Sequence, residues 1–393
     1  MNEKLRRLLT PEGVHDLLPA LAGSKRTVEN LMQEIFLRFG YREVVTPAFE
    51  YSASFTAGSA DSLEEQMYRF PDERGRTLVL RPDFTVPLAR LAATHLAGEP
   101  KPLRLCYSGS IYRYTSGRQG RQREVAQAGV ELIGANCAGS DAETVALAVT
   151  VLRELGMEQF TICLGHVGFL QALLNAHGIE GRAGEQAKHY LNSKDFVSLQ
   201  EMVHALPLPA FSKECLLRVP ALRGGQEVLR EAERLLPGER GESALAALRE
   251  VCQILDDYGM TRFVSLDLGL VRDMDYYTGM VFEGYTAGLG FPLCGGGRYD
   301  RLLGHFGPDL PAVGFALNTD HLLTVLQRLK KLPNGQELVF VGYDEANRAT
   351  AFARAEELRR QGAAVIVDVK ARDKAETGRE GKRLGAAVTH YYG

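Results

Sequence analysis

The chain has 393 residues, which is long enough for two or three domains that each have a core. Its 45% hydrophobic and 24% charged residues are typical of a soluble globular protein, and its net charge of −3 argues against a strongly basic nucleic-acid-binding chain. No apolar run is long enough to predict a membrane span, and the charged N-terminus lacks the apolar stretch of a secretory signal, so we expect a cytoplasmic protein. The six scattered cysteines form no C-x-x-C pair, so we predict buried thiols, no metal site and no cofactor.

The first two thirds of the chain predict a mixture of helices and strands. Residues 24–39 place apolar side chains on one stripe, which predicts an amphipathic helix that ends at Gly40. Residues 166–260 are rich in Leu and Ala and predict a mostly helical segment. A further helix is predicted over 142–155, and strands are predicted at 41–46, 77–80, 103–114, 124–133, 262–267, 281–285 and 312–317.

A charged and turn-like stretch at 330–335 predicts a domain boundary. Beyond it, strands alternate with helices, and this alternation predicts a small domain with a parallel sheet. The predicted strands are 338–342, 364–369 and 386–391, and the predicted helices are 346–361 and 373–384.

The first stretch that suggests chemistry is Arg81-Pro-Asp-Phe-Thr85. If it is strand-like, Arg81, Asp83 and Thr85 all face one side, because side chains alternate along a strand. Asp83 and Thr85 then offer acceptors for an ammonium group. The alternative is a solvated strand end on which Arg81 and Asp83 form a surface ion pair.

The second stretch, residues 111–131, has two strand-like runs around a basic, glycine-containing loop and predicts a hairpin. Its loop arginines, Arg118, Arg121 and Arg123, suit a phosphate or carboxylate partner, although a solvated basic turn explains them equally. Gln127 and Glu131 are four residues apart and share one face of a strand, where they could bind a polar small molecule.

Two further stretches follow at 270–283 and 294–300. In the first, Arg272, Tyr276 and Tyr277 precede a predicted strand, and these tyrosines either line a site or pack on the core. The second, Cys294-Gly-Gly-Gly-Arg-Tyr-Asp300, lacks the G-K-[ST] ending of a phosphate-binding loop. Its glycines are more typical of a bend or bulge in a sheet.

Together and in this order, these stretches resemble histidyl-tRNA synthetase, a class II aminoacyl-tRNA synthetase, over roughly residues 5–325. Residues 81–85 are similar to its R-P-E-G-T motif, residues 112–131 to motif 2, residues 311–323 to motif 3, and 270–283 and 294–300 to its two histidine-specific motifs. The resemblance implies an α+β fold, with an antiparallel sheet flanked by helices in a synthetase-like domain at 1–328. It also implies a helical insertion at about 170–260 and a shortened, anticodon-binding-like α/β domain at 335–393.

Carried over residue by residue, the resemblance implies a histidine pocket. The α-ammonium would contact Asp83, Thr85 and Gln127, the imidazole nitrogens Glu131 and Tyr277, and the carboxylate Arg113 and Arg272, with Tyr276 and Tyr299 lining the site. The chemistry agrees, because a zwitterion with a polar ring needs an acid, an arginine and polar groups at its ring.

The departures from the synthetase pattern concern the nucleotide. Motif 3 of the synthetases ends in Glu-Arg, whose arginine grips the ATP phosphates, and this chain has Asp320-His321 there. Thr115 replaces an acidic residue of motif 2, Phe84 replaces the glycine of R-P-E-G-T, and Asp273 adds a negative charge. Losing one preorganised donor costs roughly 10²–10³ in rate, so we expect no amino-acid activation.

This pattern resembles the ATP phosphoribosyltransferase regulatory subunits, synthetase-like proteins of histidine biosynthesis. The resemblance implies a non-catalytic subunit that self-associates as a dimer, joins a short-form catalytic subunit in a hetero-octamer and confers feedback inhibition by histidine. Because the C-terminal domain is shortened and has no evident basic stripe, we do not expect tRNA binding. The alternatives are a divergent but active histidyl-tRNA synthetase and a stand-alone, synthetase-like histidine sensor.

Overall fold

The computed structural model describes residues 8–56, 61–114, 122–236, 239–272, 276–333 and 337–393. The chain forms two compact units. Unit 1 comprises residues 1–16 and 28–331, and unit 2 comprises residues 17–27 and 332–393. None of the helices in the described ranges is both long and apolar enough to cross a membrane.

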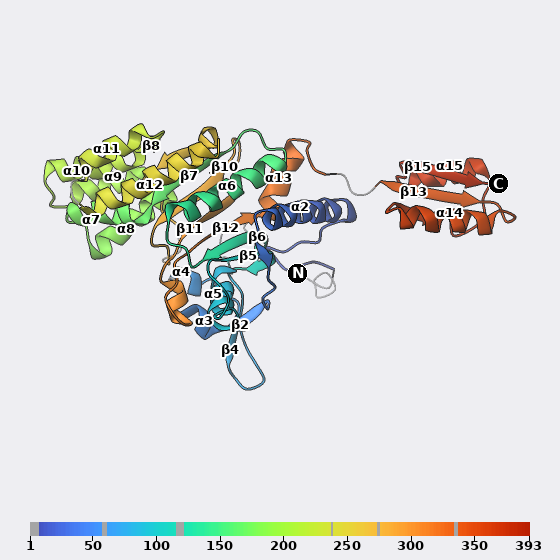
Figure 1. The fold of residues 1–393 in the computed structure, drawn as a ribbon, viewed down its shortest axis with the longest axis horizontal. Helices are drawn as coiled ribbons and strands as arrows, with labels where there is room; N and C mark the ends of the chain where they lie inside the picture. Colours follow the sequence, from blue (N-terminus) through green and yellow to red (C-terminus); the bar gives the residue numbers. More distant parts are fainter. Residues whose placement is uncertain (1–7, 57–60, 115–121, 237–238, 273–275, 334–336) are drawn as a thin grey trace. The chain divides into compact units, whose positions relative to one another are not determined.

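A nine-stranded sheet lies at the centre of unit 1 (Figure 1). Its strands are β1 (Arg42–Glu43), β5 (Leu103–Tyr112), β6 (Glu124–Ile133), β7 (Thr161–His166), β8 (Arg223–Gly224), β9 (Val264–Asp267), β10 (Met280–Tyr285), β11 (Cys294–Arg298) and β12 (Ala312–Asn318). Their order is β1-β5-β6-β12-β11-β10-β7-β9-β8. In this sheet order, neighbouring strands from β5 through β7 are antiparallel, whereas β1 pairs with β5 and β9 pairs with β7 in parallel. The predicted α+β class and largely antiparallel sheet are therefore confirmed.

The predicted hairpin is present, because β5 and β6 pair from Leu103 with Ile133 to Tyr112 with Glu124. Its loop at 115–121, with Arg118 and Arg121, lies outside the described residues. The glycine run at 294–298 is a regular strand rather than a bend or bulge, since β11 pairs continuously with β10 and β12. The neighbouring strands come so close that a Cβ at Gly296 would lie 2.1 Å from a backbone oxygen of β12.

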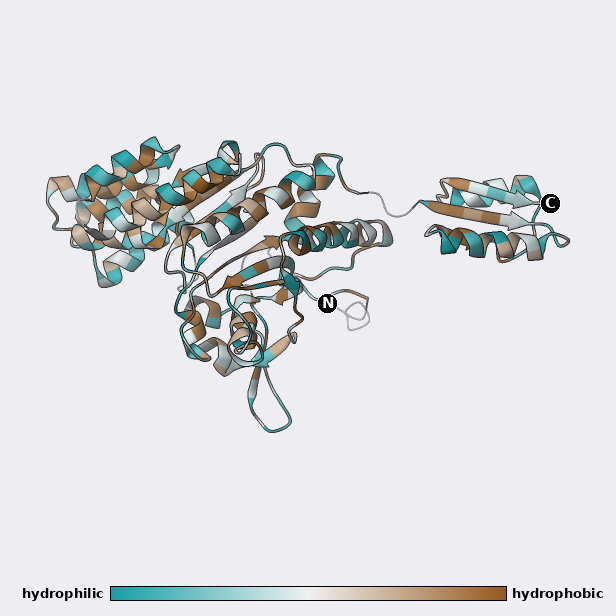
Figure 2. Ribbon diagram, in the orientation of Figure 1, coloured by the Kyte–Doolittle hydropathy of each residue, from teal (hydrophilic) through white to brown (hydrophobic). Residues whose placement is uncertain are grey.

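Helices pack on this sheet, and hydrophobic residues line its strands (Figure 2). Up to residue 331, the described helices outside the insertion are α2 (Pro19–Arg38), α3 (Ser52–Thr56), α4 (Asp61–Glu64), α5 (Thr85–Thr94), α6 (Ala138–Glu154), α13 (Thr319–Arg328) and the 3-10 turn η3 (Leu302–His305). A second, antiparallel sheet has the order β2-β4-β3, from β2 (Phe49–Tyr51), β3 (Arg69–Pro71) and β4 (Thr77–Leu80). Residues 81–85 do not form the strand-like segment that the sequence suggested, because β4 ends at Leu80 and α5 begins at Thr85.

The predicted helical insertion is confirmed between β7 and β9. It consists of α7 (Val167–Ala176), α8 (Gly181–Ser193), α9 (Phe196–Ala205), α10 (Ala210–Arg218), η1 (Val219–Ala221), α11 (Glu227–Leu235), α12 (Glu239–Asp257) and η2 (Thr261–Phe263). The apolar stripe of α12, at positions 245, 248, 251 and 255, is buried. The left-handed Gly259, with a φ of +68°, follows the end of this helix.

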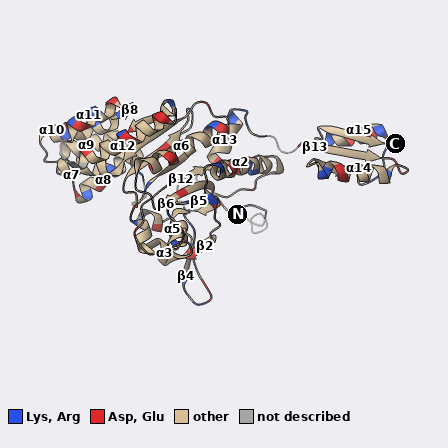
Figure 3. Cartoon of the chain, in the orientation of Figure 1, with Lys and Arg blue, Asp and Glu red and all other residues tan. Residues whose placement is uncertain are grey.

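Unit 2 contains the predicted parallel sheet, in the order β14-β13-β15. Its elements are β13 (Leu338–Tyr343), α14 (Arg348–Arg360), β14 (Ala364–Val367), α15 (Lys374–Arg383) and β15 (Val388–Tyr392). Val341, Tyr343, Ala351 and Ala355 form its buried core. Basic and acidic residues are interspersed along α14 and α15 (Figure 3), and most of the basic residues on α14 pair with a glutamate three positions away.

Candidate functional site

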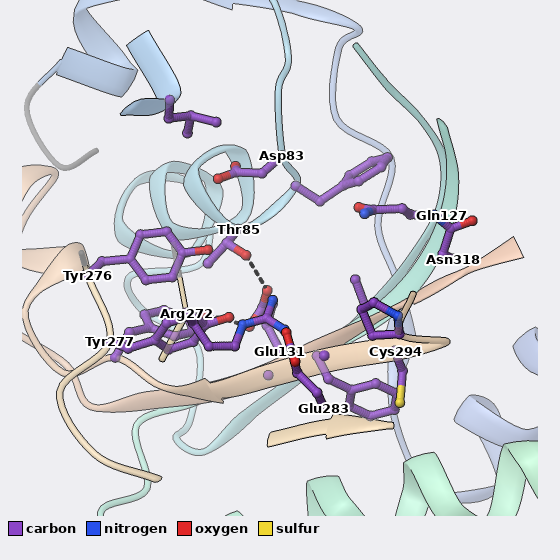
Figure 4. A pocket seen from close by; sticks show the side chains of 18 of the residues that line it. Asp83, Thr85, Gln127, Glu131, Arg272, Tyr276, Tyr277, Glu283, Cys294 and Asn318 are labelled. Carbon is purple, nitrogen blue, oxygen red and sulfur yellow. Dashed lines mark hydrogen bonds and ion pairs between the residues drawn. The ribbon is translucent and has the colours of Figure 1, made fainter. Parts of the chain in front are cut away.

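Unit 1 contains a cavity of about 310 Å³ whose walls come from β5, β6, β10, β11, β12 and the segment before α5. All nine residues that the sequence predicts for the site line it, although they are spread over more than 200 positions. Figure 4 labels all of them except Arg113 and Tyr299. These residues are Asp83, Thr85, Arg113, Gln127, Glu131, Arg272, Tyr276, Tyr277 and Tyr299.

Asp83 provides a buried acceptor at one end of the cavity. Its Oδ1 accepts a hydrogen bond of 3.2 Å from the backbone N–H of Val86 in the first turn of α5. Its Oδ2 is buried and has no partner among the described residues. Burial raises the pKa of Asp83 to about 6, against the Val86 hydrogen bond and the nearby Arg113, which lower it. A buried oxygen without a partner costs about 1–3 kcal/mol, so this end of the cavity favours a cationic donor.

The surface ion pair between Arg81 and Asp83, the alternative suggested by the sequence, does not form. Arg81 is buried and donates from Nε to the carbonyl of Ser110 and from Nη1 to the carbonyl of Thr46, each at 2.8 Å. Its guanidinium also lies 4.0 Å from the ring centroid of Phe84. Arg81 therefore supports the wall of the cavity, while Asp83 faces its interior.

Glu131 lies on β6 and is almost completely buried. Its Oε1 accepts from the Thr85 hydroxyl at 2.9 Å, and its Oε2 accepts from the Tyr299 hydroxyl at 2.5 Å. Burial nevertheless raises the pKa of Glu131 to about 8, so the acid carries a proton at neutral pH. Only glycine fits at position 314 on the neighbouring strand, because a Cβ there would lie 1.7 Å from Oε2.

Two arginines bring positive charge to the cavity, and they differ in their partners. Arg113 donates from Nε to the carbonyl of Pro82 at 2.8 Å and forms no ion pair with a described residue. Arg272 donates from Nη1 to Oε1 of Glu283 at 2.7 Å. Arg113 is therefore the cation that is available to a ligand carboxylate, whereas Glu283 neutralises Arg272.

Three tyrosines form the aromatic wall. The ring of Tyr276 lies 5.0 Å from that of Tyr277 and 5.6 Å from that of Tyr299, between centroids. Tyr276 belongs to the buried core cluster and Tyr277 packs against it, while both line the cavity. Core packing and cavity lining, the two alternatives for these tyrosines, therefore do not exclude each other.

The pair Asp320-His321 divides between two roles. Asp320 accepts from the backbone N–H of Ala126 at 3.0 Å and so ties α13 to β6. His321 lines the cavity, donates from Nδ1 to the carbonyl of Pro292 at 2.8 Å and packs 3.9 Å from the ring of Phe291. Burial lowers the pKa of His321, so a neutral ring stands where the synthetases carry a cation.

Phe84 does not close the cavity. Its ring is stacked on that of Tyr107 with 4.3 Å between centroids, and Arg81 covers its other side, so it forms part of the wall. Thr115 and Asp273, the other two departures from the synthetase pattern, lie outside the described residues. Arg123, from the predicted basic loop, lies 3.6 Å from Glu12 and does not line the cavity.

The sequence did not predict a role for Glu283 or Asn192, and both line the cavity. Glu283 is part of the histidine-specific stretch, but its pairing with Arg272 depends on how β10 and the preceding loop fold together. Asn192 comes from α8 in the helical insertion, so this insertion contributes to the wall. Nothing in the local sequence around Asn192 indicates this.

Comparisons with known proteins agree with the fold. Residues 13–322 match the family model described as histidyl-tRNA synthetase. The chain is 42% identical to an ATP phosphoribosyltransferase regulatory subunit from Moorella thermoacetica, over 94% of each chain. It is 39% identical to one from Acetivibrio thermocellus, over 93% of this chain and 88% of the relative. A crystal structure described as an ATP phosphoribosyltransferase regulatory subunit/histidyl-tRNA synthetase from Bacillus halodurans superimposes with a TM-score of 0.86 at 34% identity, over 98% of each chain. The chain belongs to the ATP phosphoribosyltransferase regulatory subunits, a family that carries the histidyl-tRNA synthetase fold.

Proposed function

We propose that this chain is the cytoplasmic regulatory subunit of an ATP phosphoribosyltransferase, and that it binds histidine in the cavity of unit 1 to mediate feedback inhibition. The buried Oδ2 of Asp83, which has no partner among the described residues, is the observation that carries the proposal. It lies in a cavity that also contains Arg113, which forms no ion pair with a described residue, and a buried acid, Glu131. These three groups match the ammonium, carboxylate and ring of histidine.

In this proposal each end of the ligand has its own partners. The α-ammonium donates to Asp83, and Thr85 and Gln127 complete that end of the site. The carboxylate accepts from Arg113, and the imidazole exchanges hydrogen bonds with Glu131. Tyr277 lies beside the ring, and Arg272 joins the carboxylate when its pair with Glu283 opens.

The site favours histidine recognition over nucleotide chemistry. A triphosphate needs cations, but the ring of His321 is neutral and Glu283 neutralises Arg272. This supports a non-catalytic subunit over an active histidyl-tRNA synthetase. The paired charges along α14 likewise support a chain that does not bind tRNA.

The partner in this proposal is a short-form ATP phosphoribosyltransferase catalytic subunit, assembled with dimers of this chain into a hetero-octamer. Histidine inhibits if it binds one state of the assembly better than the other. The difference between its two binding free energies sets how far it can shift the equilibrium between these states. The names of the relatives support the catalytic partner and leave the stoichiometry as a proposal.

The test is to co-purify the chain with a short-form catalytic subunit and to measure phosphoribosyl transfer with and without histidine. We expect stimulation by the chain and inhibition by histidine, and we expect Asp83→Asn to keep the stimulation while losing most of the inhibition. A catalytic subunit that never co-purifies favours the stand-alone sensor. Charging of tRNA by the purified chain favours the synthetase.

A further inference from the structure

A second depression in unit 1, of about 1000 Å³, is not used by the proposed function. It lies where the end of α6, the start of β7, the turn η2 and the end of β10 meet. Arg153 and Arg262, both exposed, line it together with the aromatic residues Phe160, Phe263 and Tyr285.

The two arginines converge on one ring. The Cζ atom of Arg262 lies 4.6 Å from the centroid of Phe263, and that of Arg153 lies 5.5 Å from it. The two Cζ atoms are therefore at most about 10 Å apart, the sum of these distances. Phe160 stacks on Phe263 at 4.8 Å with an angle of 8° between the rings, and both rings are buried. The ring pair thus holds two like charges together.

No acid neutralises this pair within the described part of the chain. Among the acidic side chains near the two arginines in sequence, Glu154 bonds to Arg38 and Asp256 to Thr261. Glu158 lines the depression, and its carboxylate pairs with Lys331. Neither Arg153 nor Arg262 forms an ion pair with a described residue, although each guanidinium has donors for a bidentate contact. Two unneutralised guanidinium groups at the wall of a wide depression favour a ligand with at least two negative charges.

A hydrogen-bonded chain connects the depression to the first cavity. Tyr285 lines the depression, and its hydroxyl donates to Oε2 of Glu283. The other oxygen of Glu283 accepts from Arg272 at 2.7 Å, inside the first cavity. Tyr285 and Glu283 are two residues apart on β10, so their side chains share one face of the sheet.

We infer that the depression is a second ligand site, which binds the phosphate groups of a di- or polyphosphate small molecule through Arg153 and Arg262. Phe263 cannot stack on a base, because Phe160 and the arginines already cover it. In this proposal the two arginines therefore recognise the phosphates. Through Tyr285 and Glu283 the bound anion changes how firmly Arg272 is held and hence the affinity for histidine. This second part rests on the proposed histidine site.

The binding test uses inorganic pyrophosphate, titrated calorimetrically into the purified chain at low ionic strength. Arg153→Gln combined with Arg262→Gln should weaken binding at least tenfold, while Arg360→Gln, an exposed arginine of unit 2, should leave it unchanged. ATP should bind no more tightly than pyrophosphate. Equal binding by the double variant and the unmodified chain overturns the site, as does loss of binding in Arg113→Gln alone, which would put the anion in the first cavity. Tighter binding of an acidic peptide than of pyrophosphate also overturns it.

The coupling test measures histidine affinity with and without saturating pyrophosphate. We expect at least a threefold shift in the unmodified chain and none in Tyr285→Phe, which keeps the ring and removes the hydroxyl. The same shift in both proteins contradicts the connection through Tyr285. If neither the unmodified chain nor Tyr285→Phe binds histidine, the proposed function fails. The pyrophosphate titration still decides whether the second site exists.

Discussion

The buried acid Glu131 should make the protein less stable as the pH rises, and Glu131→Gln should remove this effect. Burial raises the pKa of Glu131 from its ordinary 4.5 to about 8. Below pH 4.5 the acid is protonated in the folded and the unfolded chain, so the stability that the protonated acid allows is fully present. Between the two values only the unfolded chain releases the proton, so stability falls as the pH rises through this window.

The size of the effect follows from the two pKa values. They differ by about 3.5 pH units, from 4.5 to 8, and each unit is worth about 1.4 kcal/mol. The unmodified chain should therefore lose up to roughly 5 kcal/mol from this group between pH 4.5 and 8. The amide of Glu131→Gln does not titrate, although replacing an oxygen by NH₂ costs about 1 kcal/mol at the Tyr299 hydrogen bond. The variant should thus be the less stable protein at low pH and the more stable one at high pH.

The assay is thermal unfolding of both proteins at pH 5, 7 and 8.5. For a chain of this length 1 kcal/mol corresponds to roughly 1 °C. Because the unmodified chain has already lost about 1 kcal/mol from this group at pH 5, the variant should melt at about the same temperature there and a few degrees higher at pH 8.5. Glu250→Gln, which changes an exposed glutamate on α12, should follow the unmodified chain at every pH. Melting curves of Glu131→Gln that stay below those of the unmodified chain at all three values refute the reasoning.

Three substitutions test other parts of the cavity. Asp83→Asn should weaken histidine binding about 10- to 100-fold in calorimetry, because a charge-assisted hydrogen bond is worth roughly 1.5–3 kcal/mol; unchanged affinity would remove Asp83 from the ammonium site. Gly295→Ala places a Cβ 1.9 Å from Nη1 of Arg272, so it should displace this side chain and weaken histidine binding about tenfold. The control Gly290→Ala, with no atom within 4 Å of its Cβ, should leave histidine binding unchanged. Phe84→Ala should lower the free energy of unfolding by about 3–5 kcal/mol in denaturant titrations, and a loss below 1 kcal/mol would contradict the packing described for its ring.

The sequence predicts the residues of this cavity better than their interactions. Motif order brings nine residues to one cavity, because three of the four motifs that supply them include or adjoin strands of the nine-stranded sheet, while residues 81–85 join β4 of the smaller sheet to α5. The unpartnered oxygen of Asp83 and the ion pair of Arg272 with Glu283 depend on side-chain positions that no spacing reveals. Asn192 reaches the cavity from α8, a helix that lies outside all of the motifs in the sequence.

Short strands and glycine-rich strands are also difficult to predict from the sequence. The strands β2 and β3 have three residues each, too few for a visible alternation of polar and apolar side chains. The strand β11 is mostly glycine and lacks the β-branched residues that normally mark a strand. Glycine is needed in this strand because β10 and β12 lie too close for a side chain between them. This requirement appears only in the folded sheet and not in the local sequence.

The central claim is that this chain recognises histidine but does not activate it. The most direct measurement is histidine-dependent exchange of pyrophosphate into ATP, performed on a sample whose histidine binding has been established by calorimetry. We predict saturable histidine binding with exchange no faster than in a control without protein, because the ring of His321 is neutral, Glu283 pairs with Arg272, and the histidine carboxylate engages Arg113. Robust histidine-dependent exchange would contradict the account.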